Sequence, residues 1–354
     1  MDTIIRLQDP DGESSSYLLE AILDASHNAS EGTGMFAFAS AKGVRMLFDD
    51  ADFAAFLKRA SFDLIVGVDA VTNVATLALL KEYTETYRKL VVRVFLHHRK
   101  GILFHPKFCW FRSLKGGTAV LGSGNLTLGG LAGNWEAFSL CGATTAEAQT
   151  TAAQWRKWTL SNKARLKSVD DEEVLARAAK NVAAAIPAVD SDDVALDDVS
   201  STTAPDTVMI AEIPRGERWK QANFDLETFR QFFQATPGAR QRVFLWHVAA
   251  DGTVGDIEVR PCVSVKSQNY RIELGAAVNL SYPEGSARPI AVFLRSATRK
   301  FRYRLLMPED PSYNHVLRIL AQRWTGRTGR MRRVTMSSDE LRRAWPDSPL
   351  LPEP

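Results

Sequence analysis

Apolar residues in the first half of the chain follow two alternating patterns. Short apolar runs that are typical of buried strands occupy residues 35–39, 62–68 and 90–96. Segments with apolar residues at helical spacing occupy residues 17–29, 49–60 and 73–89. Strands that alternate with helices in this way predict an α/β layered domain.

The pattern continues with shorter strands and ends with two helices. Glycine-rich turns separate apolar runs at residues 103–111, 118–121 and 136–141, and helical patterns follow at residues 146–160 and 171–184. We therefore expect a mixed sheet with flanking helices over residues 1–189.

Apolar residues follow a different pattern in the last part of the chain, residues 206–354. Short β-type runs cover residues 207–213, 242–248, 256–265, 289–295 and 300–307, with helical patterns only at 225–234 and 313–324. Many short strands separated by turns predict a mainly β domain, built as a small and partly open barrel, over residues 206–354.

An acidic segment divides the two patterns. Residues 188–205 are rich in Asp, Ser and Thr and lack aromatic residues, which is typical of a solvated connector. We place the linker at residues 190–205, and a chain of 354 residues is long enough for a domain on each side of it.

Composition narrows the class of protein. Apolar residues make up 45% of the chain and charged residues 24%, which indicates a globular protein rather than a disordered one. The first residues show no basic start followed by an apolar run, so we expect no signal peptide and a cytoplasmic location. Three widely spaced cysteines, Cys109, Cys141 and Cys262, predict reduced thiols.

Charge is distributed unevenly. Residues 1–189 hold 21 Lys and Arg against 20 Asp and Glu, residues 190–205 hold none against 5, and residues 206–354 hold 23 against 16. The positive excess lies in the second domain and is mostly arginine, which suits phosphates and guanine edges. This indicates a polyanionic partner.

One group of polar residues is a candidate catalytic site. His105 and Lys107 lie two residues apart, so a strand would place an imidazole and an ammonium on the same side. The run Gly122-Ser123-Gly124-Asn125 follows, and its glycines permit close backbone approach while the Asn125 amide can donate to an oxyanion. Glu136 then offers a carboxylate that can orient a histidine. Phosphoryl transfer needs these parts.

Other interpretations of the same residues remain open. His105 and Lys107 alone are more often structural, and the glycines can simply form a hairpin. His97, His98 and His105 are candidate zinc ligands, but no fourth ligand follows at metal spacing.

Taken together, His105-x-Lys107, the run from Gly122 to Asn125 and the downstream Glu136 resemble the half-site of the phospholipase D superfamily. One departure is visible, because that superfamily often has Asp five residues after the Lys and this chain has Arg112. Glu136 is the better candidate for the orienting carboxylate. The two-part layout is similar to restriction endonucleases of the BfiI kind, which join a phospholipase D domain to a B3-like pseudobarrel that reads DNA.

The resemblance implies a mechanism. One His-x-Lys set is half a site, so two chains would pair their first domains into a homodimer and hydrolyse DNA phosphodiesters without a catalytic metal. His105 would form a phosphohistidine, the second His105 would protonate the leaving oxygen, and Lys107, Asn125 and Ser123 would hold the phosphate.

The second domain offers candidate contacts to double-stranded DNA. Cations and amides are interleaved in two polar stretches, and the resemblance implies that these are the arms that clasp the major groove. The candidates are Arg215, Arg218, Trp219, Lys220, Gln221, Asn223, Lys266, Ser267, Asn269 and Arg271, with Arg332 as a phosphate contact.

Partners and rival functions follow from the same comparison. A methyltransferase of the same system is expected, and a helicase-like ATPase subunit is an open possibility. The chain has no phosphate-binding Gly-x-x-x-x-Gly-Lys-Ser/Thr loop, so any ATP dependence would come from that partner. The rival interpretations are a non-catalytic DNA-binding regulator and a phosphodiesterase that acts on phospholipid.

Overall fold

The computed structural model describes residues 3–12, 15–181, 207–216, 219–236, 240–264, 270–326 and 331–351. Internal contacts divide the chain into an N-terminal unit, residues 1–10 with 15–197, and a C-terminal unit, residues 11–14 with 198–354. The predicted acidic linker at residues 190–205 lies outside the described residues.

The N-terminal unit is built on one mixed sheet, with the strand order β1-β7-β6-β5-β2-β3-β4-β8. Its strands are β1 (Thr3–Gln8), β2 (Glu31–Phe36), β3 (Ser61–Gly67), β4 (Leu90–Phe95), β5 (Lys107–Ser113), β6 (Gly116–Gly122), β7 (Glu136–Ala143) and β8 (Leu166–Lys167). Strands β2, β3 and β4 run parallel, and β5 runs antiparallel to β2. The carboxyl ends of β2–β4 and the start of β5 therefore lie at the same edge of the sheet.

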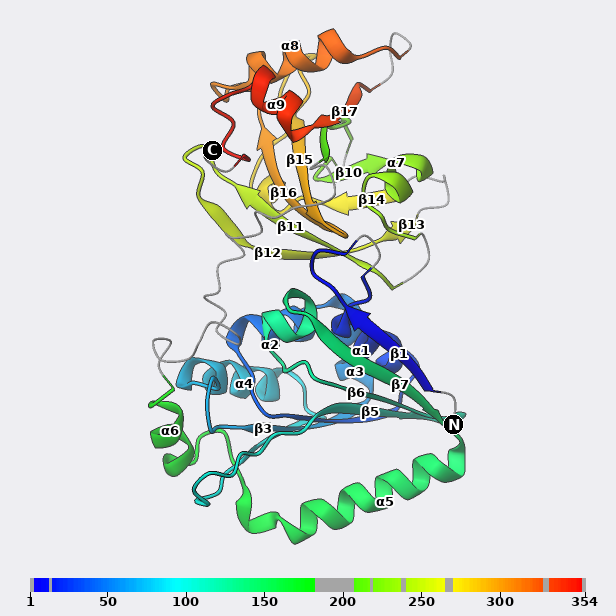
Figure 1. The fold of residues 1–354 in the computed structure, drawn as a ribbon, viewed down its shortest axis with the longest axis vertical. Coiled ribbons are helices and arrows are strands. Elements are labelled where there is room, and N and C mark those ends of the chain that lie inside the picture. The colour runs from blue at the N-terminus through cyan, green and yellow to red at the C-terminus, as the bar shows by residue number, and fades with distance from the viewer. Residues whose placement is uncertain are drawn as a thin grey trace. The chain divides into compact units, whose positions relative to one another are not determined.

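Helices cover both faces of this sheet unequally. Helices α1, α2, α3 and α4 lie on one face, and α5 crosses the other face (Figure 1). The helices are α1 (Leu18–Ser26), α2 (Ala41–Phe48), α3 (Ala51–Arg59), α4 (Val74–Thr86), α5 (Thr145–Ser161) and α6 (Glu172–Ala178). The α/β layering expected from the sequence is confirmed.

Aromatic rings fill the layer between α3 and the sheet. The ring of Phe62 on β3 stacks on that of Phe111 on β5 with centroids 6.0 Å apart, and Phe56 of α3 packs edge-on against both. A Cβ at Gly32 would lie 2.7 Å from the Phe111 ring, so β2 needs glycine there. This explains why the strand predicted at residues 35–39 in fact begins at Glu31: its first residues are small and polar, with no apolar signal.

The C-terminal unit has two sheets. Six strands form the order β12-β11-β16-β15-β9-β17, and three more form β10-β14-β13. They are β9 (Thr207–Glu212), β10 (Gln221–Phe224), β11 (Arg242–Val248), β12 (Val254–Pro261), β13 (Val263–Ser264), β14 (Tyr270–Glu273), β15 (Ile290–Ala297), β16 (Lys300–Leu306) and β17 (Arg333–Ser337). Its helices are α7 (Leu226–Gln231), α8 (Tyr313–Arg323) and α9 (Ser338–Ala344).

Both faces of the six-stranded sheet are buried. On β15, Ala291 and Phe293 point into a phenylalanine-rich core, whereas Ile290 and Val292 point into a second core together with Val316 of α8. This accounts for the unbroken apolar run from 290 to 294. The unit is mainly β, as expected, but the strands that the structure describes form no closed barrel.

Two stretches predicted as loops are partly strands. Residues 221–224 and 270–273 pair antiparallel as β10 and β14, with Asn223 opposite Arg271. Only alternate residues of β10, Ala222 and Phe224, are buried, so four residues with two apolar positions gave no recognisable pattern. Among the described residues, no helix is long and apolar enough to span a membrane.

Candidate active site

The predicted catalytic residues meet at one edge of the N-terminal sheet. Phe108 of β5 pairs with Leu121 of β6, and Gly122 at the end of β6 pairs with Phe138 of β7. The residues just beyond these pairs are therefore neighbours. They are Lys107 at the start of β5, Ser123 after the end of β6 and Glu136 at the start of β7.

His105 and Lys107 contact each other directly. His105 is exposed just before β5, and the Lys107 Nζ lies 2.9 Å from its Nε2 and 3.2 Å from its Nδ1. An ammonium has only donors, so a hydrogen bond from Lys107 requires a ring nitrogen without a proton as its acceptor. A deprotonated ring nitrogen is what nucleophilic attack requires. The Phe38 ring packs edge-on against the imidazole at 6.0 Å.

Ser123 connects the loop after β6 to Glu136. Its Oγ donates a hydrogen bond to Glu136 Oε2 and accepts one from the Ala137 amide at 3.1 Å. Its backbone amide donates to the Ala137 carbonyl at 3.0 Å. The Glu136 carboxylate is therefore fixed by Ser123 at the catalytic edge.

Asn125 is held by the backbone of another segment. Its side chain is buried, and its Oδ1 accepts a hydrogen bond from the Phe38 amide at 3.2 Å. With the oxygen engaged there, the amide nitrogen is the end that can donate elsewhere. The loop is tightly packed, because a Cβ at Gly124 would lie 2.6 Å from the Gly130 carbonyl oxygen.

Gln8 of β1 was not predicted from the sequence, and it contacts the segment that precedes Glu136. Its side chain is buried; Oε1 accepts from the Leu18 amide at 3.0 Å, and Nε2 donates to the Asn134 carbonyl at 2.9 Å. Gln8 thus fastens the start of α1 to the segment that leads into Glu136. A lone glutamine in a short strand gives no sequence signal for this role.

Arg112, at the position where the superfamily often has Asp, lies away from the site. It is five residues beyond Lys107 on β5, and strand geometry puts it roughly 16 Å away. Its guanidinium pairs with Glu31 of β2, the residue opposite it in register. Arg112 therefore supports strand pairing, and Cys109 between them is a buried thiol whose pKa burial raises.

A second missed cluster anchors the chain just before His105. Asp69 follows β3 and is 4% exposed; its Oδ2 accepts from the Phe104 amide at 3.0 Å and lies 3.3 Å from His97 Nε2. Arg177 of α6 pairs with Oδ1 at 3.0 Å. His97 is thus tied to a carboxylate, and among the described residues no group of His, Cys, Asp and Glu has the arrangement of a metal site.

The predicted DNA contacts of the C-terminal unit fall into three groups. Arg218, Lys266, Ser267 and Asn269 lie outside the described residues. Gln221 and Asn223 on β10 stand beside Arg271 on β14, whose Nε donates to Asn223 Oδ1 at 2.9 Å. Among the described residues of the two predicted arms, Gln221 and Asn223 therefore lie on a strand paired with that of Arg271.

The remaining candidates are engaged within the unit. Arg215 donates to the Gly285 carbonyl at 2.6 Å, and Lys220 donates to the Val278 carbonyl. Trp219 is 7% exposed and belongs to the phenylalanine-rich core. Arg332 donates through Nε and Nη2 to the buried Glu212.

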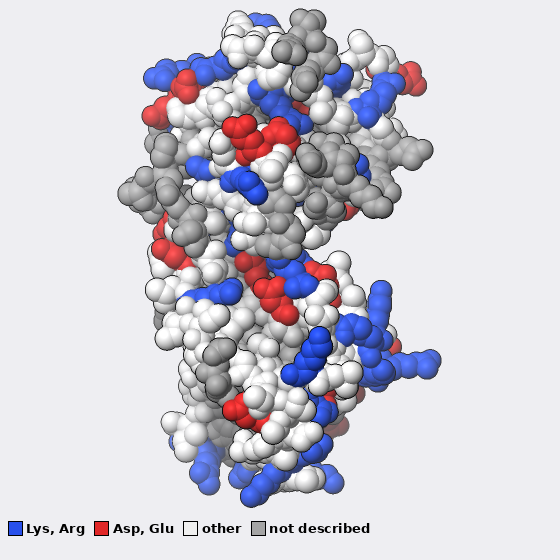
Figure 2. Space-filling view, turned by 90° about the vertical axis from the view of Figure 1, so that its right-hand side faces the viewer, with Lys and Arg blue, Asp and Glu red and all other residues white. Residues whose placement is uncertain are grey.

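Many arginines of this unit are paired with acids. The pairs are Arg260–Glu258, Arg288–Glu212, Arg304–Asp310, Arg323–Glu340, Arg332–Glu212 and Arg333–Asp225. On the face in Figure 2, acidic side chains lie beside several of the basic ones.

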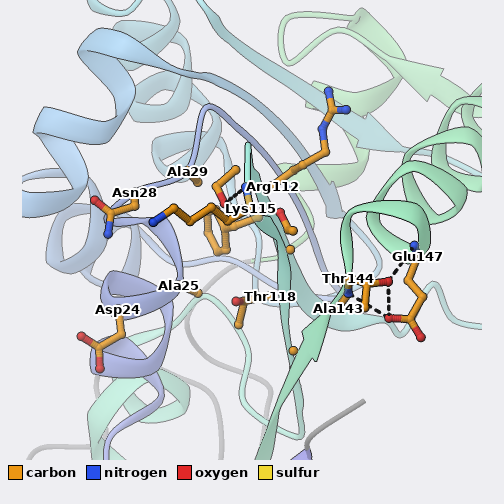
Figure 3. A pocket seen from close by; sticks show the side chains of 15 residues that line it. Asp24, Ala25, Asn28, Ala29, Arg112, Lys115, Thr118, Ala143, Thr144 and Glu147 are labelled. Carbon is orange, nitrogen blue, oxygen red and sulfur yellow. Dashed lines mark hydrogen bonds between the residues drawn. The ribbon is translucent and has the colours of Figure 1, made fainter.

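A hollow of about 550 Å³ lies at the opposite edge of the N-terminal sheet, between α1 and the ends of β5, β6 and β7. Figure 3 shows Lys115 extending along it toward Asn28, with Thr144 and Glu147 on another side. Thr144 and Glu147 form the capping box of α5, and this holds the pKa of Glu147 below its ordinary value. The hollow contains none of the predicted catalytic residues.

Comparison with known proteins gives structural matches only. No protein-family model matches the chain, and the search of curated proteins gives no match. Three solved structures align with 47% of it: Nuc, a phospholipase D family member from Salmonella typhimurium (14% identity, TM-score 0.34, 97% of that chain), NucT from Helicobacter pylori (13%, 0.32, 99%) and phosphatidylserine synthase from Haemophilus influenzae (16%, 0.34, 39%). At these identities and TM-scores, the matches assign neither family nor activity to the chain.

Proposed function

We propose that the chain is a phosphodiesterase that hydrolyses DNA without a catalytic metal. The observation that carries this is the contact between His105 and Lys107, at the same sheet edge as the hydrogen bond from Ser123 to Glu136. A nucleophile, a fixed positive charge and an oriented carboxylate are the parts that phosphoryl transfer needs.

The proposed reaction has two steps. In the first, the imidazole of His105 attacks phosphorus; the P–N bond forms, the P–O bond breaks, and the leaving oxygen takes a proton from His105 of the partner subunit. In the second, that same imidazole of the partner subunit takes a proton from water, whose oxygen attacks phosphorus and breaks the P–N bond. Lys107 and Asn125 stabilise the charge on the phosphate oxygens in both steps.

The proposal includes a homodimer, because the superfamily that the motif resembles combines two half-sites in one site and this chain has one Gly-Ser-x-Asn run and thus one half-site. The attacking and leaving groups lie on opposite sides of phosphorus, and one imidazole cannot occupy both. Each chain contributes one His105, so the proposed site needs two chains.

More specifically, we propose that this phosphodiesterase is a restriction endonuclease. The C-terminal unit, a B3-like DNA reader in this proposal, would bind duplex through Gln221, Asn223 and Arg271, which lie on the paired strands β10 and β14. Amide side chains suit adenine edges, and arginine suits guanine. A methyltransferase would protect the host site, and a helicase-like ATPase subunit would supply any ATP dependence.

The test is plasmid cleavage by the full chain in EDTA, with and without ATP. We expect cleavage in EDTA, its loss by about 1,000-fold or more in His105→Ala, and an acid-labile, alkali-stable phosphoryl adduct on the wild type. The control is Lys115→Ala, at the opposite edge. Activity that EDTA abolishes and Mg²⁺ restores, in the absence of an ATPase, would refute the mechanism.

A further inference from the structure

We propose that the edge of the N-terminal sheet from β5 to β8 binds the phosphates that flank the scissile one, through Arg99, Lys100 and Lys163. The inference rests on the proposed function and names an extended nucleic-acid strand as the ligand of this edge. It assigns DNA contacts to the catalytic unit itself, in addition to those proposed for the C-terminal unit.

The first observation is that Arg99 and Lys100 are exposed and that their side chains have no partner among the described residues. Arg99 and Lys100 lie on the loop between β4 and β5, and both are exposed. Within the described part of the chain, neither side chain has a hydrogen-bond or ion-pair partner, in contrast to the paired arginines of the C-terminal unit. Gly101, at φ +71, turns the chain back directly after them.

The second observation is that this loop is firmly anchored at its base. The amide of Arg99 donates to His97 Nδ1 at 3.2 Å, and the Nε2 of that ring lies 3.3 Å from Asp69 Oδ2. Asp69 Oδ2 also accepts a hydrogen bond from the Phe104 amide, next to His105. The same buried carboxylate therefore lies against residues at both ends of the loop, His97 and Phe104.

The third observation is the order of the cations along the edge. The sheet order places β5 with Lys107 first, then β2, β3 and β4, and finally β8. Lys163 is exposed in the turn before β8, where the Arg165 carbonyl accepts from the Leu96 amide at 2.9 Å. From β5 to β8 there are four strand spacings, about 19 Å. One strand of duplex DNA carries about five or six phosphates over that length.

A row of cations beside the reacting group fits a linear polyanion. The same loop exposes Ile102 and Leu103, at 52% and 57%, which an anionic lipid surface would also accept. Two apolar side chains on one loop make a small membrane contact, whereas the cations come from two separate elements in a line. We therefore assign the edge to nucleic acid, and vesicles form one arm of the test.

The experiment compares two double variants of the full chain. Arg99→Ala/Lys100→Ala removes two of the three proposed contacts and leaves Lys163 in place. The control, Arg88→Ala/Lys115→Ala, also removes one exposed Arg and one exposed Lys that have no side-chain partners among the described residues. Both control residues lie at the opposite edge of the sheet: Arg88 precedes β4, and Lys115 lies in the turn between β5 and β6. The substrates are plasmid DNA and bis(p-nitrophenyl) phosphate, a single diester too short to reach the loop.

For Arg99→Ala/Lys100→Ala we expect the KM for DNA to rise about tenfold at physiological salt. The slope of log KM against log salt should fall by about 1.8, and hydrolysis of the small diester should stay unchanged. The control variant should match the wild type on both substrates. Equal loss on both substrates, or no difference from the control on DNA, would overturn the inference.

A binding arm separates this inference from the proposed function. The same double variants in a His105→Ala background are titrated with random-sequence duplex and with phosphatidylserine vesicles. Weaker duplex binding than in the control supports the inference even if the wild type hydrolyses neither substrate, which would refute only the function. Unchanged duplex binding with weaker vesicle binding would overturn the inference in favour of a lipid surface.

Discussion

Gly43→Ala tests whether α2 sets the position of the catalytic loop. Gly43 lies in the first turn of α2, which begins after Ser40, and it faces the segment that follows Asn125. A Cβ at this position would lie 2.4 Å from both the Leu126 carbonyl oxygen and the Thr127 Cα. Both atoms belong to the backbone, so no side-chain rotation can relieve the contact.

The size of the effect follows from these distances. Ordinary contact begins near 3.4 Å, so the loop and the helix must separate by about 1 Å. Alanine favours the helix over glycine by about 1 kcal/mol, whereas overpacking costs about 1 to 3 kcal/mol. We therefore expect a net loss of up to about 2 kcal/mol in the free energy of unfolding. Because a 1 Å misplacement of catalytic groups costs about 100-fold in rate, we expect kcat to fall about 100-fold in a protein that still folds.

The assay is hydrolysis of bis(p-nitrophenyl) phosphate together with urea denaturation of the full chain. Arg45→Ala, on the exposed side of the same helix, is the control and should change neither quantity. Wild-type kcat in a folded Gly43→Ala protein would refute the claim that this helix positions the loop. A loss of stability with unchanged kcat would mean that Asn125 does not participate in the reaction.

Three further predictions follow. Gln8→Leu removes the buried acceptor of the Leu18 amide and the donor to the Asn134 carbonyl, and we expect urea denaturation to show a loss of about 2 to 4 kcal/mol; a loss below 1 kcal/mol would contradict this. Glu136→Ala should lower kcat about 100-fold while Arg112→Ala leaves it nearly unchanged, and equal effects in steady-state kinetics would be the contrary result. Burial lowers the pKa of His247 below its ordinary 6.5, with nearby Arg304 adding to the shift and Glu258 opposing it. The unfolded chain then takes up a proton more readily, so thermal stability of the C-terminal unit should decline as the pH falls below about 6.5, and His247→Asn should lack that part of the decline.

The sequence predicted the elements whose apolar period was long enough to recognise. The segment 242–248 coincides with β11, and the helical pattern at 313–324 corresponds to α8. Strands β1 and β10 were missed because their burial depends on partners distant in the chain. On β1, Ile5 and Leu7 are exposed while polar Gln8 is buried, which reverses the usual pattern.

Some residues of the candidate site were predicted from the sequence, and others were recognised only in the structure. His105, Lys107 and Ser123 were predicted from a motif over one stretch of sequence and from its resemblance to a known superfamily. Asp69 and His97 are 28 residues apart and meet only because β3 and β4 are parallel neighbours that end at one edge. A general rule could have found them, since polar residues directly after parallel strands converge at the carboxyl edge of a sheet. That rule needs the strand order, which the sequence pattern does not provide.

Strand β5 carries a proposed catalytic residue and buried core residues within a few positions of each other. Lys107 lies at its first position, beside the exposed His105, whereas Trp110 is buried against Ala148 and Ala152 of α5. Alternation along the strand places Cys109 and Phe111 on the same face as Lys107 and places Trp110 on the other, and Cys109, Phe111 and Trp110 are all buried. His105, the proposed nucleophile, is exposed and precedes the strand. Its position depends on the carboxylate of Asp69 bonded to the Phe104 amide, on Lys107 and on the ring of Phe38. A substitution that weakens one of these contacts should therefore change the rate before it changes the stability of the fold.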